Sequence, residues 1–339
     1  MRARITKGKI GVRMAVAATA AGMAAAALMM TAGVAVADAV NQADGSPAVD
    51  IAVDGSSGGR VFDGIGAVSG GGATTRLLLD YPKQERDEVL DYLFKPGYGA
   101  SLQQLKVEIG GDTNSTDGSE SCHMHARGQV DCNAGYEWWL MEEAVKHNPD
   151  INLGALAWGA PGWLDGYYSQ DTIDYFIQWL NCAARHGLHI DNMGVRNERS
   201  YDSAWIKKYR AALDAAGYQD VRIIASDEAA VKGEWPIAVD MASDPALYDA
   251  VGLLGNHYSR GLSSPTAESL NKPLWISEGG PWNADWGHGG TDTSIPSLLN
   301  HAYIRGRITA VQIWNLLKAY YDGLSITDAG LMRANTPWA

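Results

Sequence analysis

Apolar and polar positions alternate along the chain in a regular succession of strand-like and helix-like segments from residue 60 onward. Short apolar runs bounded by turn residues predict strands, and apolar residues spaced three or four apart predict helices. The predicted strands are residues 61–68, 102–109, 153–158, 192–196, 221–226, 250–256, 274–277 and 309–314. The predicted helices are residues 82–94, 136–146, 172–185, 203–216, 235–241, 265–270 and 295–305.

This order predicts an α/β fold in which a parallel (β/α)8 TIM barrel occupies residues 60–339. Eight strands that alternate with helices favour a closed barrel over an open sheet. Residues 38–59 are polar and poorly patterned, and we interpret them as a lead-in to the barrel. In such a barrel, side chains at the carboxyl ends of the strands carry the chemistry.

Residues 1–37 have the pattern of a secretory signal peptide. Five basic residues and no acidic residue stand in residues 1–13, an apolar stretch follows, and Ala35-Val36-Ala37 offers a small-x-small cleavage site. We therefore expect a secreted, extracellular protein with no stable membrane insertion after cleavage. An uncleaved membrane anchor is the alternative, because the apolar stretch is long enough to span a bilayer.

Charge and composition narrow the choice of partners. Cleavage after residue 37 would change the formal net charge from −12 to −17, because it removes five basic residues and no acidic one. Such an acidic chain repels nucleic acid and anionic membrane surfaces. The 12 tryptophans fit a neutral, hydroxyl-rich small molecule such as a glycoside or glycolipid better, and we expect no cofactor.

Three cysteines remain to be assigned. Cys122 and Cys132 flank a polar loop, and we expect them to form a local disulfide outside the cell. Residues 122–125, with the sequence Cys-His-Met-His, also bring metal-ligating side chains together, but their spacing matches no common zinc pattern, and we expect no metal site. Cys182, on the apolar face of a predicted helix, is interpreted as a small buried residue.

Two glutamates that follow short apolar runs are the strongest candidates for chemistry. Glu278 ends the run 274–277, and Glu198 follows the run 193–195 beside Asn197. The ends of the fourth and seventh strands face each other across a barrel mouth, so two carboxyl groups can meet there as in a glycosidase. Like-charge repulsion from Glu278 is expected to raise the pKa of Glu198 and keep it protonated.

In the alternative interpretation, both glutamates are ordinary strand-end residues in salt bridges, Glu198 with Arg196 or Arg199. Two glutamates at these two strand ends favour catalysis instead. Other strand ends carry side chains whose roles stay open between substrate contact and structural support: Glu108, Trp158, Asp227, His257, Tyr258, Trp314 and Asn315.

Five stretches of the sequence carry a resemblance to a known family. They are residues 62–74 (FDGIGAVSGGGAT), 106–112 (KVEIGGD), 135–141 (GYEWWLM), 197–201 (NERSY) and 319–321 (AYY). On these motifs, residues 60–338 resemble the galactocerebrosidases (galactosylceramidases) of glycoside hydrolase family 59. Members of that family are retaining β-galactosidases of sphingolipid metabolism, with a parallel barrel at the centre.

The resemblance implies roles for five residues. By similarity, Glu198 matches the family's acid/base and Glu278 its nucleophile. Thr116, Trp158 and Asn197 match its galactose-binding positions. The expected function is therefore that of a retaining glycoside hydrolase that cleaves terminal β-galactosides, such as galactosylceramide-like lipids. The alternatives are another retaining β-glycosidase or an inactive sugar-binding remnant.

The sequence also departs from the family's pattern. Gly279 and Gly280 stand where the family has Asp-Phe after the nucleophile, and the cysteine pair looks like a local addition. Family members continue into β-sandwich and lectin-like domains, which this chain is expected to lack together with a galactose-binding arginine. Residues 49–61 join the sandwich in the family, so here we expect them to be mobile or to pair between molecules.

Overall fold

The structure is a computed structural model, and it describes residues 56, 58–72, 74–230, 233–280, 291–320 and 330–335. The predicted signal peptide and most of residues 38–61 lie outside the described residues. The barrel belongs to the compact unit Gly58–Ala339. Among the described helices, none is both long and apolar enough to cross a membrane.

Eight parallel strands close into a barrel, so the predicted fold class is confirmed. Each strand pairs with its neighbour in sequence, and the first strand also pairs in parallel with the last, with Gly64 opposite Ala310. The strands are β1 (Gly64–Ser69), β2 (Gln104–Glu108), β3 (Asn152–Leu156), β4 (Asn192–Gly194), β5 (Arg222–Ala229), β6 (Leu253–His257), β7 (Leu274–Gly279) and β8 (Ala310–Trp314).

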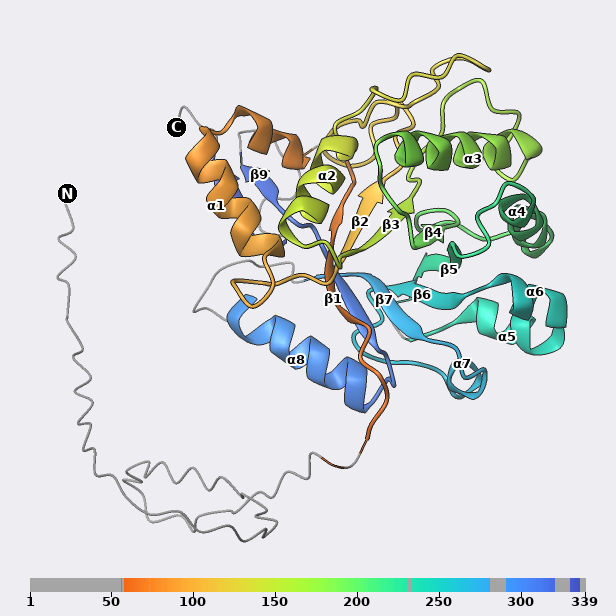
Figure 1. Ribbon diagram of the computed structural model, residues 1–339. Helices are drawn as coiled ribbons and strands as arrows, with labels where there is room; N and C mark the ends of the chain where they lie inside the picture. Colours follow the sequence, from red (N-terminus) through yellow and green to blue (C-terminus); the bar gives the residue numbers. More distant parts are fainter. Residues whose placement is uncertain are drawn as a thin grey trace, which may run out of the picture. The chain divides into compact units, whose positions relative to one another are not determined.

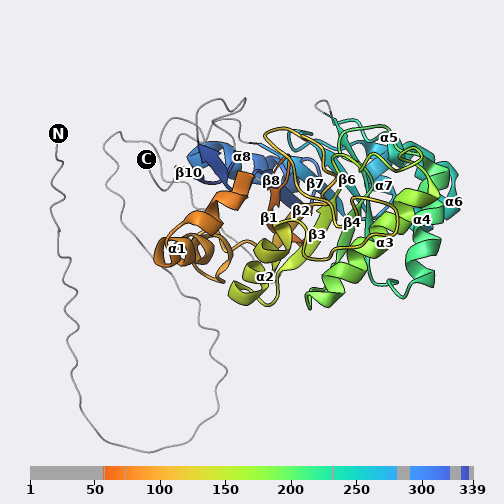
Figure 2. The same ribbon diagram turned by 90° about the horizontal axis from the view of Figure 1, so that it is seen from above.

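Helices surround the barrel in Figure 1, and the turned view in Figure 2 shows them on both sides of the strands. They are the 3-10 helix η1 (Thr74–Asp80), α1 (Lys83–Phe94), α2 (Glu137–His147), α3 (Gln170–Arg185), α4 (Ser203–Ala215), α5 (Pro236–Ser243), α6 (Pro245–Ala250), α7 (Pro265–Ser269) and α8 (Thr291–Ile304). A short parallel pair, β9 (Lys318–Tyr320) and β10 (Arg333–Asn335), follows the barrel.

The predicted elements agree with the observed ones to within a few residues, but the sequence pattern missed η1, α6 and the β9–β10 pair. Helix α6 escaped notice because only Asp244 separates it from α5. The Asp244 carboxylate accepts a hydrogen bond from Leu247 N at 3.0 Å, and Pro245 occupies the first turn. The backbone N–H of Asp244 therefore bonds to the last turn of α5 and its side chain caps α6, so the chain turns without a loop.

The two faces of each strand have different neighbours, as period-two alternation requires. Leu105 and Val107 of β2 belong to the main hydrophobic core. Lys106 between them faces the interior of the barrel, where its Nζ lies 3.6 Å from Asp227 Oδ1. Elsewhere in the interior, Gln312 donates a hydrogen bond to Gln104 at 3.0 Å. The barrel interior thus holds polar and charged groups that a purely structural core would exclude.

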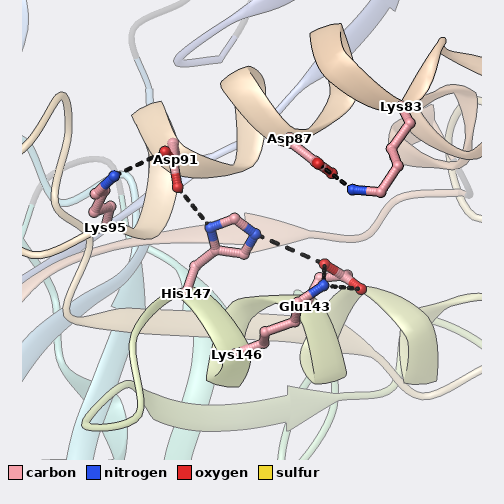
Figure 3. Close-up of polar contacts among 7 residues, drawn as sticks. All are labelled: Lys83, Asp87, Asp91, Lys95, Glu143, Lys146 and His147. Carbon is pink, nitrogen blue, oxygen red and sulfur yellow. Dashed lines mark hydrogen bonds and ion pairs between the residues drawn. The ribbon is translucent and has the colours of Figure 1, made fainter.

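Polar contacts on α1 and α2 are drawn in Figure 3, and the contact between His147 and Asp91 is the one among them that joins the two helices. His147 at the end of α2 places Nδ1 2.8 Å from Asp91 Oδ1 of α1 and Nε2 3.7 Å from Glu143 Oε2. Partly exposed contacts of this kind near the surface contribute about 0–1 kcal/mol each. The buried side chains Leu90 and Leu93 of α1 therefore contribute more to holding this layer on the barrel.

The disulfide joins Cys132 to Cys182, and Cys122 is a buried free thiol. The predicted Cys122–Cys132 bond is wrong, as is the interpretation of Cys182 as an unpaired residue. Asp112 accepts hydrogen bonds from both the backbone N–H and the thiol of Cys122. Helix α3 meanwhile carries Cys182 to within 5.0 Å of Cys132, measured between Cα atoms. Spacing along the chain does not show this tertiary contact.

Candidate active site

Glu198 and Glu278 lie together at the carboxyl ends of β4 and β7. Glu278 is a buried residue of β7, whereas Glu198 lies in the loop before α4 with its side chain 34% exposed. Glu198 has a φ of 49°, and its N–H donates to the carbonyl of Asp227 at 2.9 Å. One carboxylate oxygen of each glutamate lies within 4.8 Å of the other. The structure therefore brings together the two glutamates that the sequence singled out.

His257, at the end of β6, lies between these two carboxylates. Its Nδ1 is 3.3 Å from Glu198 Oε1 and 3.7 Å from Glu278 Oε2, and its Nε2 is 3.3 Å from Asp227 Oδ1. Burial would lower the pKa of His257, but the charge of Glu278 and the hydrogen bonds to Asp227 and Glu198 raise it overall. The protonated imidazole, which donates from both nitrogens, is therefore favoured.

Asp227 is fully buried beneath His257 and belongs to the same cluster. It accepts a hydrogen bond from Ser277 Oγ at 2.6 Å and lies beside Lys106 and His257. Burial favours the protonated acid, but the positive charge of Lys106 and the contacts with His257 lower the pKa of Asp227 overall. Its carboxylate therefore stays ionised and holds the imidazole in one orientation. Of the two roles that the sequence left open for Asp227, the structure shows the supporting one.

The pKa of Glu198 is lowered, so the expectation that repulsion from Glu278 raises it is wrong. The hydrogen bond with His257 has the largest effect, and it outweighs the desolvation that would raise the pKa. The sequence argument counted the two carboxylates and left out the imidazole between them. A positive charge beside a carboxylate favours its ionised form.

The two oxygens of Glu278 differ in their surroundings. Oε1 accepts a hydrogen bond from the hydroxyl of Tyr258 at 2.5 Å. Oε2 is buried and has no hydrogen-bond partner among the described residues. One oxygen is thus fixed while the other remains available as an acceptor or nucleophile.

Two of the three predicted sugar-binding residues lie near the ends of β1 and β8. Trp158, after β3, packs against Val68 and Trp314. Thr116 lies close to the same place, because a methyl group added to Gly71 would come within 3.2 Å of both Thr116 Oγ1 and Trp314 Nε1. The Thr116 hydroxyl donates to its neighbour's carbonyl at 2.7 Å. The structure therefore offers an aromatic face and an exposed hydroxyl side by side.

Asn197, the third of these residues, directly precedes Glu198. Its N–H donates to the carbonyl of Ala157 at 3.0 Å, which ties the loop after β4 to the end of β3. The side-chain Oδ1 is buried and lacks a hydrogen-bond partner in the described part of the chain. An unsatisfied buried acceptor is costly, and a ligand hydroxyl beside Glu198 would satisfy it.

Glu108 braces the loop that carries Thr116. Its Oε2 accepts hydrogen bonds from the N–H groups of Gly71 and Gly72 at 3.0 and 2.9 Å, and from Ser115 Oγ at 3.1 Å. Burial raises the pKa of Glu108 to about 7 despite these bonds. Gly72 has a φ of 104°, and a Cβ there would come within 2.7 Å of Gly118 N, so the loop packs backbone against backbone.

Within the described residues, two clusters place three possible metal ligands within 4.8 Å of one another. The first is the candidate active site itself, Glu198, His257 and Glu278. The second cluster, Asp112, Cys122 and His125, lies in the loop after β2.

Residues 62–339 match glycosyl hydrolase family 59 over most of the chain. The chain belongs to this family. Galactocerebrosidase from Danio rerio is 45% identical over 290 residues, which cover 83% of this chain and 42% of that protein. Galactocerebrosidase from Homo sapiens is 46% identical over 297 residues, or 85% and 42% of the two chains. This family 59 chain thus spans less than half the length of these relatives.

Solved structures of more distant proteins share the barrel. SrfJ from Salmonella typhimurium superposes with a TM-score of 0.68 at 18% identity, covering 82% of this chain and 71% of that one. An endo-β1,6-glucanase gives 0.65 at 20% identity, with 81% and 71% covered. At such low identity, the likeness shows that the family 59 chain has their fold and nothing further.

Two supporting residues of this family 59 chain were missed in the sequence. Lys106 interrupts an apolar predicted strand, and a lysine there is unusual enough to have marked a charged partner. Lys318 is fully buried in β9 and forms an ion pair with Asp117, beside Thr116. No local signal could have found that pair, because its members lie 201 residues apart in the sequence.

Proposed function

We propose that the chain is a retaining glycoside hydrolase that cleaves terminal β-galactosides, with galactosylceramide-like lipids as the substrate class. The observation that carries the proposal is the approach of Glu198 and Glu278, whose nearest oxygens lie within 4.8 Å. Carboxyl groups about 5–5.5 Å apart suit direct attack on the sugar, whereas inversion needs about 6.5–9.5 Å to admit a water. The galactose preference rests on the relatives named galactocerebrosidase.

Glu278 is the proposed nucleophile. Tyr258 holds Oε1, and Oε2 has no hydrogen bond among the described residues, so Oε2 is the oxygen that would attack the anomeric carbon. The Tyr258 hydroxyl would stabilise the Glu278 carboxylate in the free enzyme. It would do so again when water releases that carboxylate from the glycosyl-enzyme intermediate.

Glu198 is the proposed acid/base, with His257 as its proton store. An acid must hold a proton when the leaving oxygen departs, yet the pKa of Glu198 is lowered by His257. Transfer of the Nδ1 proton to Glu198 Oε1, 3.3 Å away, would leave a neutral imidazole and a neutral carboxylic acid. Nε2 would keep its proton toward Asp227. Glu198 would then protonate the leaving group and later activate the water.

The first sugar subsite is proposed to contain Trp158, Thr116 and Asn197. The Trp158 ring offers an apolar face to a pyranose, and Thr116 and Asn197 offer groups that hydrogen-bond hydroxyls. Asn197 next to the acid/base would contact the reacting sugar, where hydrogen bonds strengthen in the transition state.

We further propose that residues 1–37 direct secretion as a signal peptide, which would place the enzyme outside the cell. Its proposed natural role is in sphingolipid or related galactolipid metabolism, on the names of the relatives. The basic, apolar and small-residue order of those residues and the names of the relatives support this proposal.

Hydrolysis of an aryl β-galactoside beside the matching aryl β-glucoside tests the proposal. Glu278→Gln should abolish turnover of both, and the exposed Glu142→Gln should leave it unchanged. Glu198→Ala should still hydrolyse aryl substrates with good leaving groups, and azide should restore turnover with a β-configured glycosyl azide. An α-configured azide would reverse the assignment or point to inversion. Preference for the glucoside would favour another β-glycosidase, and folded protein without any turnover would favour the inactive remnant.

A further inference from the structure

Asp112, Cys122 and His125 form a cluster that the proposed glycosidase chemistry does not use. Asp112 Oδ2 lies 2.8 Å from Cys122 Sγ and 2.5 Å from His125 Nδ1, and the sulfur and nitrogen are 3.4 Å apart. Asp112 Oδ1 also accepts the backbone N–H of Cys122 at 3.0 Å, which adds a second contact between these two residues. Three side chains of different chemistry therefore converge on one point.

We propose that these three residues bind a transition-metal ion of the zinc class. Thiolate, imidazole and carboxylate are the ligands that Zn²⁺ accepts, and a hard ion such as Mg²⁺ or Ca²⁺ would prefer oxygen alone.

The observed distances fit this assignment with one small adjustment. Ligand atoms about 2.0–2.3 Å from a tetrahedral ion lie about 3.4–3.6 Å from one another. The sulfur–nitrogen distance of 3.4 Å already has that value. Only Asp112 Oδ2 must retreat, by about 0.8 Å, as its two hydrogen bonds are replaced by metal bonds. Rotation of an exposed aspartate side chain achieves such a shift.

The position of the cluster allows an ion to enter and a fourth ligand to bind. Cys122 is buried, but the side chains of His125 and Asp112 are 57% and 36% exposed. Water would complete the tetrahedron from the solvent side. A thiolate ligand favours thiophilic ions over the more abundant hard ones.

Metal binding would act on the loop that contains Thr116. Asp112 and Cys122 stand at the two ends of that loop, and Glu108 and Lys318 hold its middle through Ser115 and Asp117. An ion shared by both ends would close the loop and reduce its freedom before any ligand binds. The inference is independent of the proposed glycosidase activity, because its test measures the metal directly.

Absorption spectroscopy with Co²⁺ in place of Zn²⁺ tests the site in the untagged full chain. Cys132 and Cys182 form the disulfide, so a cobalt–thiolate charge-transfer band can come only from Cys122. We expect one Co²⁺ per chain with such a band, displaced by Zn²⁺.

The variants Cys122→Ser and His125→Asn should lose the band and weaken Zn²⁺ binding by on the order of a hundredfold or more. His125 is exposed, so its replacement keeps the fold even if Cys122→Ser does not. His189→Asn, which removes an exposed histidine outside the cluster, is the matched control and should bind as the parent does. A parent protein without the band in excess Co²⁺, or equal Zn²⁺ affinity in all variants, would overturn the proposal.

Discussion

Glu120 should make the protein more stable at acidic than at neutral pH. Glu120 lies in the loop before α2, and its buried carboxylate packs against the first residues of that helix. Its Oε1 accepts hydrogen bonds from the N–H groups of Tyr136 at 2.7 Å and Glu137 at 3.3 Å. Burial nevertheless raises its pKa from 4.5 to about 7. Between these pH values the folded protein holds a proton on Glu120 and the unfolded chain does not.

The sign and size of the effect follow from proton linkage. Because the folded state binds the extra proton, the free energy of unfolding falls as pH rises. The stabilisation is fully present below pH 4.5 and is lost as pH rises through about 7. A shift of this size corresponds to about 3 kcal/mol, with a slope of at most about 1.4 kcal/mol per pH unit. Glu108 and Glu137, whose pKa values burial also raises, add slopes of the same sign.

Urea unfolding at a series of pH values between about 5 and 7.5 measures this slope for the parent and for Glu120→Gln. The amide oxygen still accepts the two backbone hydrogen bonds, but the side chain no longer titrates. In the variant, the free energy of unfolding should fall with pH less steeply than in the parent, by up to about 1.4 kcal/mol per pH unit. The exposed Glu85→Gln is the control and should keep the parent slope. Identical slopes in the parent and Glu120→Gln would refute the reasoning.

Three further changes test the site and the fold. His257→Asn should raise the pKa of Glu198, because the substitution removes the hydrogen bond that lowers this pKa most. In the pH profile of kcat/KM, the limb that reports Glu198 should therefore move to higher pH. An unmoved limb would argue against this coupling. Asn197→Ala should lower kcat more than it raises KM, because its contact strengthens in the transition state, and a change in KM alone would contradict that role. Replacing both Cys132 and Cys182 by Ala should lower the free energy of unfolding by about 4 kcal/mol, since the bond closes a loop of 50 residues; urea midpoints measure it, and an unchanged midpoint would contradict it.

The sequence predicted the barrel well because its signal is repeated. Each strand is a short apolar run, and each error of a residue or two at an end leaves the alternation intact. The same repetition placed Glu198 and Glu278 at strand ends, and strand ends of a closed barrel must meet at one mouth. The approach of the two carboxylates was therefore predictable before their distance was known.

The chemistry between those carboxylates was not predictable in the same way. His257 was named as a strand-end residue, but its contact with Glu198 depends on the loop after β4, whose backbone at Glu198 has a φ of 49°. The disulfide pairing was predicted wrongly for a similar reason, because the placement of α3 brings Cys182 to Cys132. Both contacts join residues far apart in sequence, and the pattern of apolar and polar positions does not indicate either of them.

The pairing of β1 with β8 has a consequence for how the protein is made. β1 is among the first parts of the barrel to leave the ribosome, yet its partner residues 310–314 follow about 245 residues later, about ten to fifty seconds at ordinary synthesis rates. Until then one edge of β1 and the leading edge of each new strand carry unpaired backbone groups that neighbouring nascent chains could join. Glu198 and Glu278 are both synthesised during this wait, and β4 and β7 become part of a closed sheet only when Trp314 is in place opposite Val68. Chaperones that cover these edges during synthesis would keep the unfinished barrel from associating with other chains.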